Sequence, residues 1–186
     1  CLVLCFLSIS YINATTALLI SDVGTSARML ALGQIEGFST GANSVFENPA
    51  ALYHIKNQSV SIFSTKLFGE VDYRNITYAK KMNKHVIALG YMDSRVGNIP
   101  RTAIRIDNGQ EKFIQTGSFD VKFSLSKLGY HYISNDKFYT GICVDYYQNN
   151  IDTIKASGFN IDTGIIYIKK PGIYSISLKN ILGFSK

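Results

Sequence analysis

From residue 58 onward, apolar and polar residues alternate along much of the chain. The clearest example is Ser118–Leu128, in which every second residue up to Leu125 is apolar. A period of two places successive side chains on opposite faces, and it predicts a β-strand with one apolar and one polar face. The same pattern recurs in Ser59–Lys66, Val71–Lys80, His85–Asp93, Phe138–Asn149, Ser157–Lys169 and Ile173–Ile181. We therefore expect an all-β chain with about seven strands.

The longer of these strands exceed the roughly five or six residues that are usual in globular sheets. They match the roughly 9–11 residues that a tilted transmembrane strand needs. The polar face of several strands carries charge, which a packed sandwich core excludes and a water-filled lumen accepts. This combination predicts an antiparallel up-and-down β-barrel of the outer-membrane type. The residues expected on its lumen side are Asp120, Lys122, Asp145 and Asp162.

The expected connections differ between the two ends of the sheet. Short turns at 81–84, 132–137 and 170–172 would lie at one end, and connections at 67–70, 94–112 and 150–156 at the other. Short turns at one end and a long loop at the other are typical of bacterial outer-membrane barrels. Such barrels have an even number of strands and at least about eight of them. We therefore expect these residues to be the N-terminal half of a larger barrel, or else a truncated gene product.

The first residues have a different character. An apolar run from Cys1 to Ile9 precedes small polar residues up to Ala17, as in a secretory signal peptide, and it is too short to span a membrane. A buried N-terminal strand is the alternative. We expect a signal peptide at 1–17, a separate segment at 18–57 and barrel strands at 58–186.

The segment at 18–57 contains a short helical pattern and a turn. Apolar residues in 26–36 have a helical spacing that Gly33 and Gly37 would end. In the Asn48-Pro49 pair the proline fixes φ and the asparagine side chain can bond to its own backbone, so the pair predicts a stiff turn ahead of the first strand.

Composition excludes several classes of function. The 186 residues carry a net charge of +6, but the basic residues are scattered, whereas a nucleic-acid-binding surface would cluster them. Without the leader, Cys143 is the single cysteine, and we expect it to fill space in a strand. His54, His85 and His131 lie far apart, with no carboxylate at metal-ligand spacing. We expect no enzyme activity, no cofactor and no metal.

Three short motifs resemble the N-terminal signature of FadL-like outer-membrane barrels, in particular their PorV/PorQ branch. They are Ala27-Arg28, Leu32-Gly33 and the run GANSVFENPAAL that ends at Leu52. Gln34 and Glu36-Gly37 depart from the family pattern. The positions that match it are Arg28, Gly33, Asn48, Pro49 and Ala50, and later in the chain Asp162, Gly164, Asn180 and Gly183.

The resemblance implies that the N-terminal segment enters the periplasmic mouth of the barrel as a plug. Arg28 would then pair with one of the carboxylates Asp120, Asp145 or Asp162, or else be a solvated helix residue. By this resemblance the protein is exported to the bacterial outer membrane, contacts its lipid, and binds or passes hydrophobic small molecules. Two alternatives stay open: a non-transporting barrel that works with protein-secretion or surface-assembly partners, and a soluble secreted β-sandwich that binds a ligand.

Overall fold

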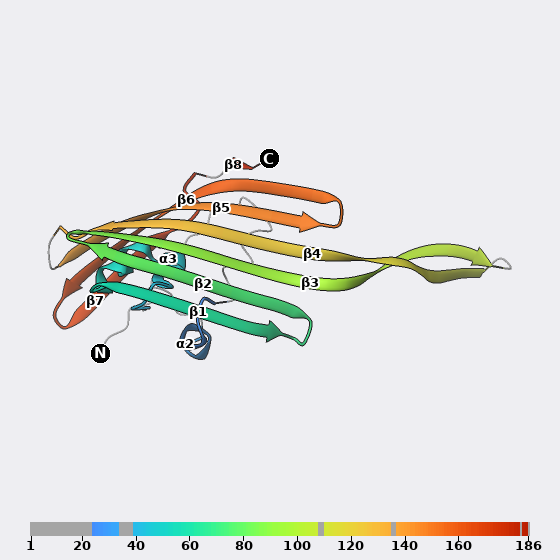
Figure 1. Cartoon of the computed structure of the whole chain (residues 1–186), viewed down its shortest axis with the longest axis horizontal. Helices are drawn as coiled ribbons and strands as arrows, with labels where there is room; N and C mark the ends of the chain where they lie inside the picture. Colours follow the sequence, from blue (N-terminus) through green and yellow to red (C-terminus); the bar gives the residue numbers. More distant parts are fainter. Residues whose placement is uncertain (1–23, 34–38, 108–109, 135–136, 183, 186) are drawn as a thin grey trace.

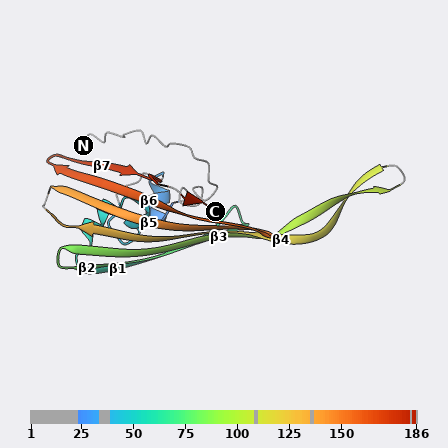
Figure 2. The ribbon, with the colours of Figure 1, turned by 90° about the horizontal axis from the view of Figure 1, so that it is seen from above.

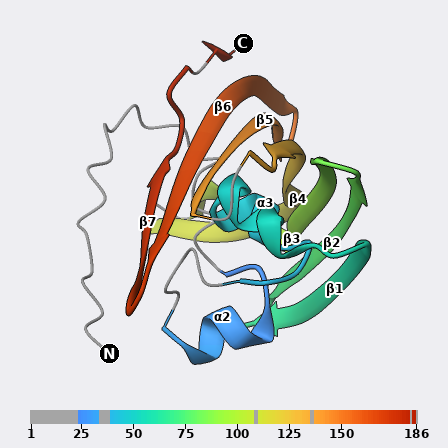
Figure 3. The same cartoon turned by 90° about the vertical axis from the view of Figure 1, so that its left-hand side faces the viewer.

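The computed structural model describes residues 24–33, 39–107, 110–134, 137–182 and 184–185. These residues form one antiparallel sheet that curls into a half-barrel, and in it the first seven strands pair with one another in the order of the chain (Figures 1 and 3). The predicted all-β, up-and-down architecture is confirmed. The strands are β1 (Gln58–Leu67), β2 (Val71–Met82), β3 (His85–Asp107), β4 (Gln110–Tyr132), β5 (Phe138–Ile151), β6 (Ile154–Lys169) and β7 (Gly172–Leu178), and a short β8 (Phe184–Ser185) pairs with β6.

The segment 94–112 is not the loop that the sequence analysis predicts. β3 continues to Asp107 and β4 begins at Gln110. Val96 is the last residue of β3 that pairs with β2, and Val121 is the first of β4 that pairs with β5. Residues 97–107 and 110–120 therefore form a two-stranded ribbon, which we call the arm and which projects from the half-barrel (Figures 1 and 2). Its sequence lacks a clear alternation because neither of its faces packs on a core.

The base of the arm is fixed by contacts of Asp120. The Arg95 guanidinium donates to Oδ2 of Asp120, and the backbone N–H of Asn98 donates to Oδ1 at 3.1 Å. Asn98 has φ of +58° and lies at a register shift between β3 and β4. A local bulge of this kind bends a strand and increases its twist, which is consistent with the arm leaving the sheet at this point. The expected loop at 150–156 is also shorter than predicted, since only Asp152 and Thr153 separate β5 from β6.

Among the described residues, three short helices precede the sheet. α2 (Ala27–Ala31) begins at Ser26, whose side chain accepts a hydrogen bond from the Met29 N–H, and it ends before Gly33, which has φ of +69°. α3 (Ser44–Glu47) and the 3₁₀-helix η1 (Pro49–His54) lie inside the curl of the sheet (Figure 3). No helix among the described residues is long and apolar enough to cross a membrane.

The core lies between these helices and the concave face of the sheet. Val45, Phe46 and Leu52 of the helices are buried against side chains from the strands. Their partners in this cluster include Tyr73, Val86, Met92, Leu125 and Tyr147. Tyr73 therefore faces the interior of the half-barrel, where it is fully buried.

Candidate functional site

Asn48 connects the N-terminal segment to the sheet. It is fully buried and caps η1, since its Oδ1 accepts a hydrogen bond from the Ala50 N–H at 2.9 Å. Its Nδ2 donates to Oγ of Ser175 at 2.9 Å and to the carbonyl oxygen of Ile176 at 3.3 Å, both in β7. Pro49 occupies the start of the helix, where a missing N–H leaves no hydrogen bond unmade. The Asn-Pro pair thus begins a helix and also binds the last long strand.

Residues 39–57, which we call the plug, are seated on glycines of four consecutive strands. A Cβ atom at Gly164 would overlap Oδ1 of Asn48, and one at Gly141 would overlap the backbone of Pro49 and Ala50. Added Cβ atoms would also meet Phe46 at 2.7 Å from Gly90 and Val45 at 2.5 Å from Gly129. The plug backbone at Gly141, and plug side chains at the other three glycines, therefore approach the sheet more closely than a Cβ atom would allow. The glycine seat consists of Gly90, Gly129, Gly141 and Gly164.

The plug also bonds to both sides of the half-barrel. On one side the Ala42 N–H donates to Oγ of Ser59 in β1 at 3.1 Å. On the other side Ser177 of β7 donates from Oγ to the carbonyl oxygen of Glu47 at 3.2 Å. The buried Glu47 carboxylate accepts hydrogen bonds from the Thr25 hydroxyl at 2.9 Å and from the Ser39 hydroxyl. Two further bonds fix the chain before α2, from the Tyr73 hydroxyl to the Gly24 carbonyl at 3.0 Å and from the Asn75 amide to the Thr25 carbonyl at 3.1 Å.

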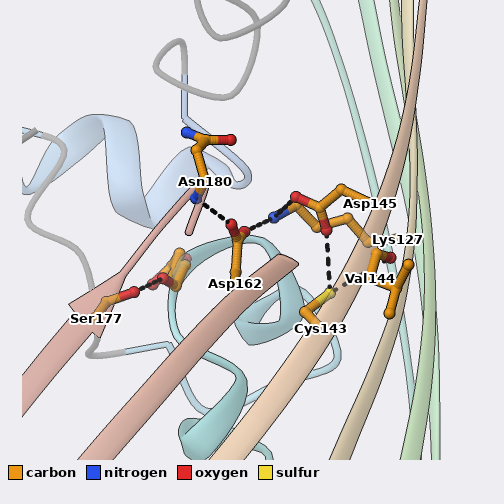
Figure 4. A network of polar contacts seen from close by, with 8 residues as sticks. Lys127, Cys143, Val144, Asp145, Asp162, Ser177 and Asn180 are labelled. Atoms are coloured by element: carbon orange, nitrogen blue, oxygen red, sulfur yellow. Dashed lines mark hydrogen bonds and ion pairs between the residues drawn. The ribbon is translucent and has the colours of Figure 1, made fainter. Parts of the chain in front are cut away.

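A buried charge cluster lies on the concave face beside the plug (Figure 4). Nζ of Lys127 in β4 lies 2.8 Å from Oδ2 of Asp145 in β5, and it also contacts Oδ2 of Asp162 in β6. The second oxygen of Asp162 accepts a hydrogen bond from the Asn180 N–H at 2.8 Å, and Sγ of Cys143 donates to Oδ1 of Asp145 at 3.3 Å. The two carboxylates are therefore satisfied by one cation and two weaker donors. The cluster connects three strands to the residue at which the chain turns after β7.

The structure divides the four predicted lumen-side residues between two faces. Asp145 and Asp162 are buried on the concave face, as their place in the pattern suggests. Asp120 and Lys122 lie on the exposed convex face of β4, together with Leu128. Their placement differs from the prediction because the plug gives the concave face an apolar partner. Leu125 and Phe123 of β4 consequently point inward to pack on it.

Of the two roles expected for Arg28, the structure shows the solvated helix residue and not the partner of a carboxylate. Its side chain is exposed, and the ion pairs found among the described residues do not include it. Lys127 pairs with both Asp145 and Asp162, and Arg95 pairs with Asp120. The sequence did not indicate a role for Lys127, because only the strand register places it directly opposite Asp145.

Aromatic residues surround the end of η1. The Tyr53 ring stacks on Tyr139 of β5 at a centroid distance of 4.0 Å, and it lies 3.9 Å from the ring of His54. Partial burial lowers the pKa of His54, so its imidazole is neutral at neutral pH. Across the described part of the chain, no three His, Cys, Asp or Glu side chains form a group that could hold a metal ion.

The fold and the site together define an open β-barrel whose concave face is covered by the chain's own N-terminal segment. No family model, no curated protein and no solved structure matches this chain.

Proposed function

We propose that this chain is a bacterial outer-membrane β-barrel protein whose convex face contacts lipid. The supporting observation is the order of polar and apolar residues on that face. Strand register aligns residues from β1 to β6 in rows of cross-strand neighbours. At the end that carries the arm, two rows are entirely polar: Lys66, Asp72, Arg95, Lys122, Asn150 and Lys155, then Ser64, Arg74, Asp93, Ser124, Gln148 and Ser157.

The next two rows are apolar except for Ser126. They consist of Ile62, Ile76, Tyr91, Ser126, Tyr146 and Phe159, then Val60, Tyr78, Leu89, Leu128, Val144 and Ile161. We call these two rows, together with the apolar residues that follow them on β3–β7 toward the short turns, the apolar band. A water-soluble sheet would cover such a band with a second layer, whereas lipid is its natural contact in a membrane.

Aromatic residues gather at the opposite end of the apolar band. Tyr130, Tyr132, Phe138, Tyr167 and Tyr174 are exposed near the short turns. Tyrosine side chains at this position suit a membrane interface, because the ring is apolar and the hydroxyl reaches water. The sharp polar boundary at one end and the aromatic residues at the other support a membrane-spanning band.

Membrane location is tested by cell fractionation and by electrophoresis with and without heating. We expect the protein in the outer-membrane fraction, extracted only by detergent, with a migration that changes on boiling. Recovery of the folded protein in aqueous buffer without detergent would contradict the proposal. The soluble β-sandwich is disfavoured because the described strands form a single sheet.

Within this class, we favour binding or passage of a hydrophobic small molecule. The proposal rests on the motif resemblance and on the apolar residues that the concave face carries beneath the plug, such as Tyr73, Met92 and Leu125. A fluorescent long-chain fatty acid is a suitable probe of binding and uptake. Asn48→Ala, which loosens the plug, should change the rate of uptake, whereas the exposed Arg28→Ala should leave it unchanged. Uptake that is independent of Asn48 would contradict a role of the plug.

The arm favours a second candidate function, a barrel component of a protein-secretion or surface-assembly system. Ile104, Ile106 and Phe113 are 59%, 72% and 75% exposed on the arm. Exposed apolar residues beyond a lipid-facing band suit contact with another protein. Co-purification of a secretion partner that is lost when these three residues are replaced by Ser would favour this function over transport.

A further inference from the structure

A polar patch on the convex face of β4–β6 carries charge that the described residues do not neutralise. Lys122, Asn150 and Lys155 are cross-strand neighbours in one row, and Ser124, Gln148 and Ser157 are neighbours in the next. We propose that this patch binds the phosphate-bearing headgroup of an anionic membrane lipid, whose acyl chains lie on the adjoining apolar band. This inference rests on the proposed location in a membrane.

The patch and the apolar band are arranged like the two parts of a lipid. Directly beyond Gln148 and Ser157 lie Tyr146 and Phe159, whose ring centroids are 4.8 Å apart. Val144 and Ile161 follow in the next row. A molecule with its charged group at Lys122 and Lys155 would thus have its apolar chain over Tyr146 and Phe159. Because strands rise roughly 3.3 Å per residue, the four residues from the charged row to the row of Tyr146 and Phe159 span about 13 Å.

Two arginines account for the carboxylates nearest to the patch. Arg95 pairs with Asp120, and Arg101 pairs with Asp152. By contrast, the ion pairs found in the described part of the chain include neither Lys122 nor Lys155, and both side chains are exposed. The next carboxylate on this face is Asp93, which lies opposite Ser124 and is itself opposite Arg74.

The surrounding groups suit a phosphate. Lysine ammonium groups are point charges that bind phosphate oxygens, and the amide and hydroxyl groups of Asn150 and Ser157 can donate hydrogen bonds. The patch is a flat, exposed surface, so free phosphate would remain hydrated and bind weakly there. A lipid differs because burial of its chains on the apolar band holds its phosphate at the patch, as in the recognition of anionic lipids by basic residues at a membrane surface.

The test uses the full chain in nanodiscs or micelles of phosphatidylcholine with added phosphatidylglycerol. Native mass spectrometry measures which lipid the protein retains, and inorganic phosphate serves as a competitor. We expect retention of phosphatidylglycerol over phosphatidylcholine to fall roughly tenfold or more in Lys122→Gln/Lys155→Gln. The control, Lys80→Gln/Lys169→Gln, removes the same charge at the other end of the strands and should retain the lipid. Millimolar inorganic phosphate should not displace it.

Three outcomes would overturn the inference: equal retention of both lipids, an equal loss in the control variant, or displacement by inorganic phosphate, which would indicate a simple anion site. If the protein enters the membrane but shows any of these results, the membrane location stands and only the lipid site fails. If the protein does not enter the membrane, both fail.

Discussion

Glycine residues of the sheet leave room for the plug to lie close against it. Gly164 lies against the Asn48 amide, and Gly117 in the arm has open space around its Cα. We predict that Gly164→Ala lowers the free energy of unfolding by about 1–3 kcal/mol, because the new methyl group must displace the plug. The matched change Gly117→Ala should alter it by less than about 0.5 kcal/mol. Urea denaturation in detergent measures both.

A double variant separates this steric effect from a general effect on the strand. Asn48→Ala removes the two atoms that the new methyl group would meet most closely, Oδ1 and Cγ of Asn48. The cost of Gly164→Ala should therefore be smaller in the Asn48→Ala background than in the native protein. Additive effects would show that the seat does not depend on this contact.

Lys127 is the residue on which the buried charges depend. Lys127→Met leaves two carboxylates without their cation on the concave face, and we predict a loss of about 3–5 kcal/mol in the free energy of unfolding. Lys122→Met makes the same chemical change on the convex face of the same strand, where the side chain is exposed, and should have little effect. Equal losses in the two variants would contradict the assignment of Lys127 to a buried cluster.

At the scale of elements, the plug stabilises the curvature of the sheet, because it bonds to β1 through Ala42 and to β7 through Asn48 and Glu47. We predict that Asn48→Ala costs about 2 kcal/mol and increases hydrogen exchange selectively in β7, whose Ser175 and Ile176 lose a partner. Asn57→Ala, at an exposed site beside β1, is the control. Uniform exchange across all strands would indicate global destabilisation and not release of one edge.

The arm is a structural unit that contributes little to the rest of the sheet. Beyond Val96 and Val121 its strands pair only with each other, although Arg101 and Asp120 at its base contact Asp152 between β5 and β6. An isolated two-stranded ribbon is of marginal stability. Replacing Ile104, Ile106 and Phe113 with Ser should therefore change the free energy of unfolding of the half-barrel, measured by urea denaturation, by less than about 0.5 kcal/mol. A large loss would show that the arm folds back onto the sheet, and limited proteolysis would then find it protected.

At the scale of the whole molecule, the sharpest prediction concerns the convex face. Leu128 lies in the apolar band, and Ser124 lies four residues away on the same face, in the polar row. We predict that Leu128→Lys costs about 2–4 kcal/mol for folding into lipid vesicles, because it places a charge at membrane depth. Ser124→Lys should cost much less. The unfolding free energy in vesicles is the measurement, and equal costs would argue against a lipid-facing band.

The sequence by itself determined where most of the strands lie. A period of two is a local property, so the alternation at Val71–Lys80 or Phe138–Asn149 was sufficient to locate β2 and β5 without knowledge of their neighbours. The helix that Gly33 ends was predictable for the same reason, since capping acts within a few residues. The Asn48-Pro49 pair was predicted as a stiff turn ahead of the first strand, whereas in the structure it begins η1. The strands of the arm were not predicted, because neither face of this ribbon packs on a core and its sequence therefore has no regular apolar side.

Only the tertiary structure decided which face of each strand is inside. The alternation in β4 is equally compatible with Asp120 and Lys122 pointing inward or outward. The plug determines the direction, because its Val45, Phe46 and Leu52 pack on the apolar side chains of the concave face. Likewise, register alone brings Lys127 opposite Asp145 and places Lys122 in one row with Lys155. Such pairings depend on residues far apart in the chain, so the local pattern that places the strands cannot determine the sites between them.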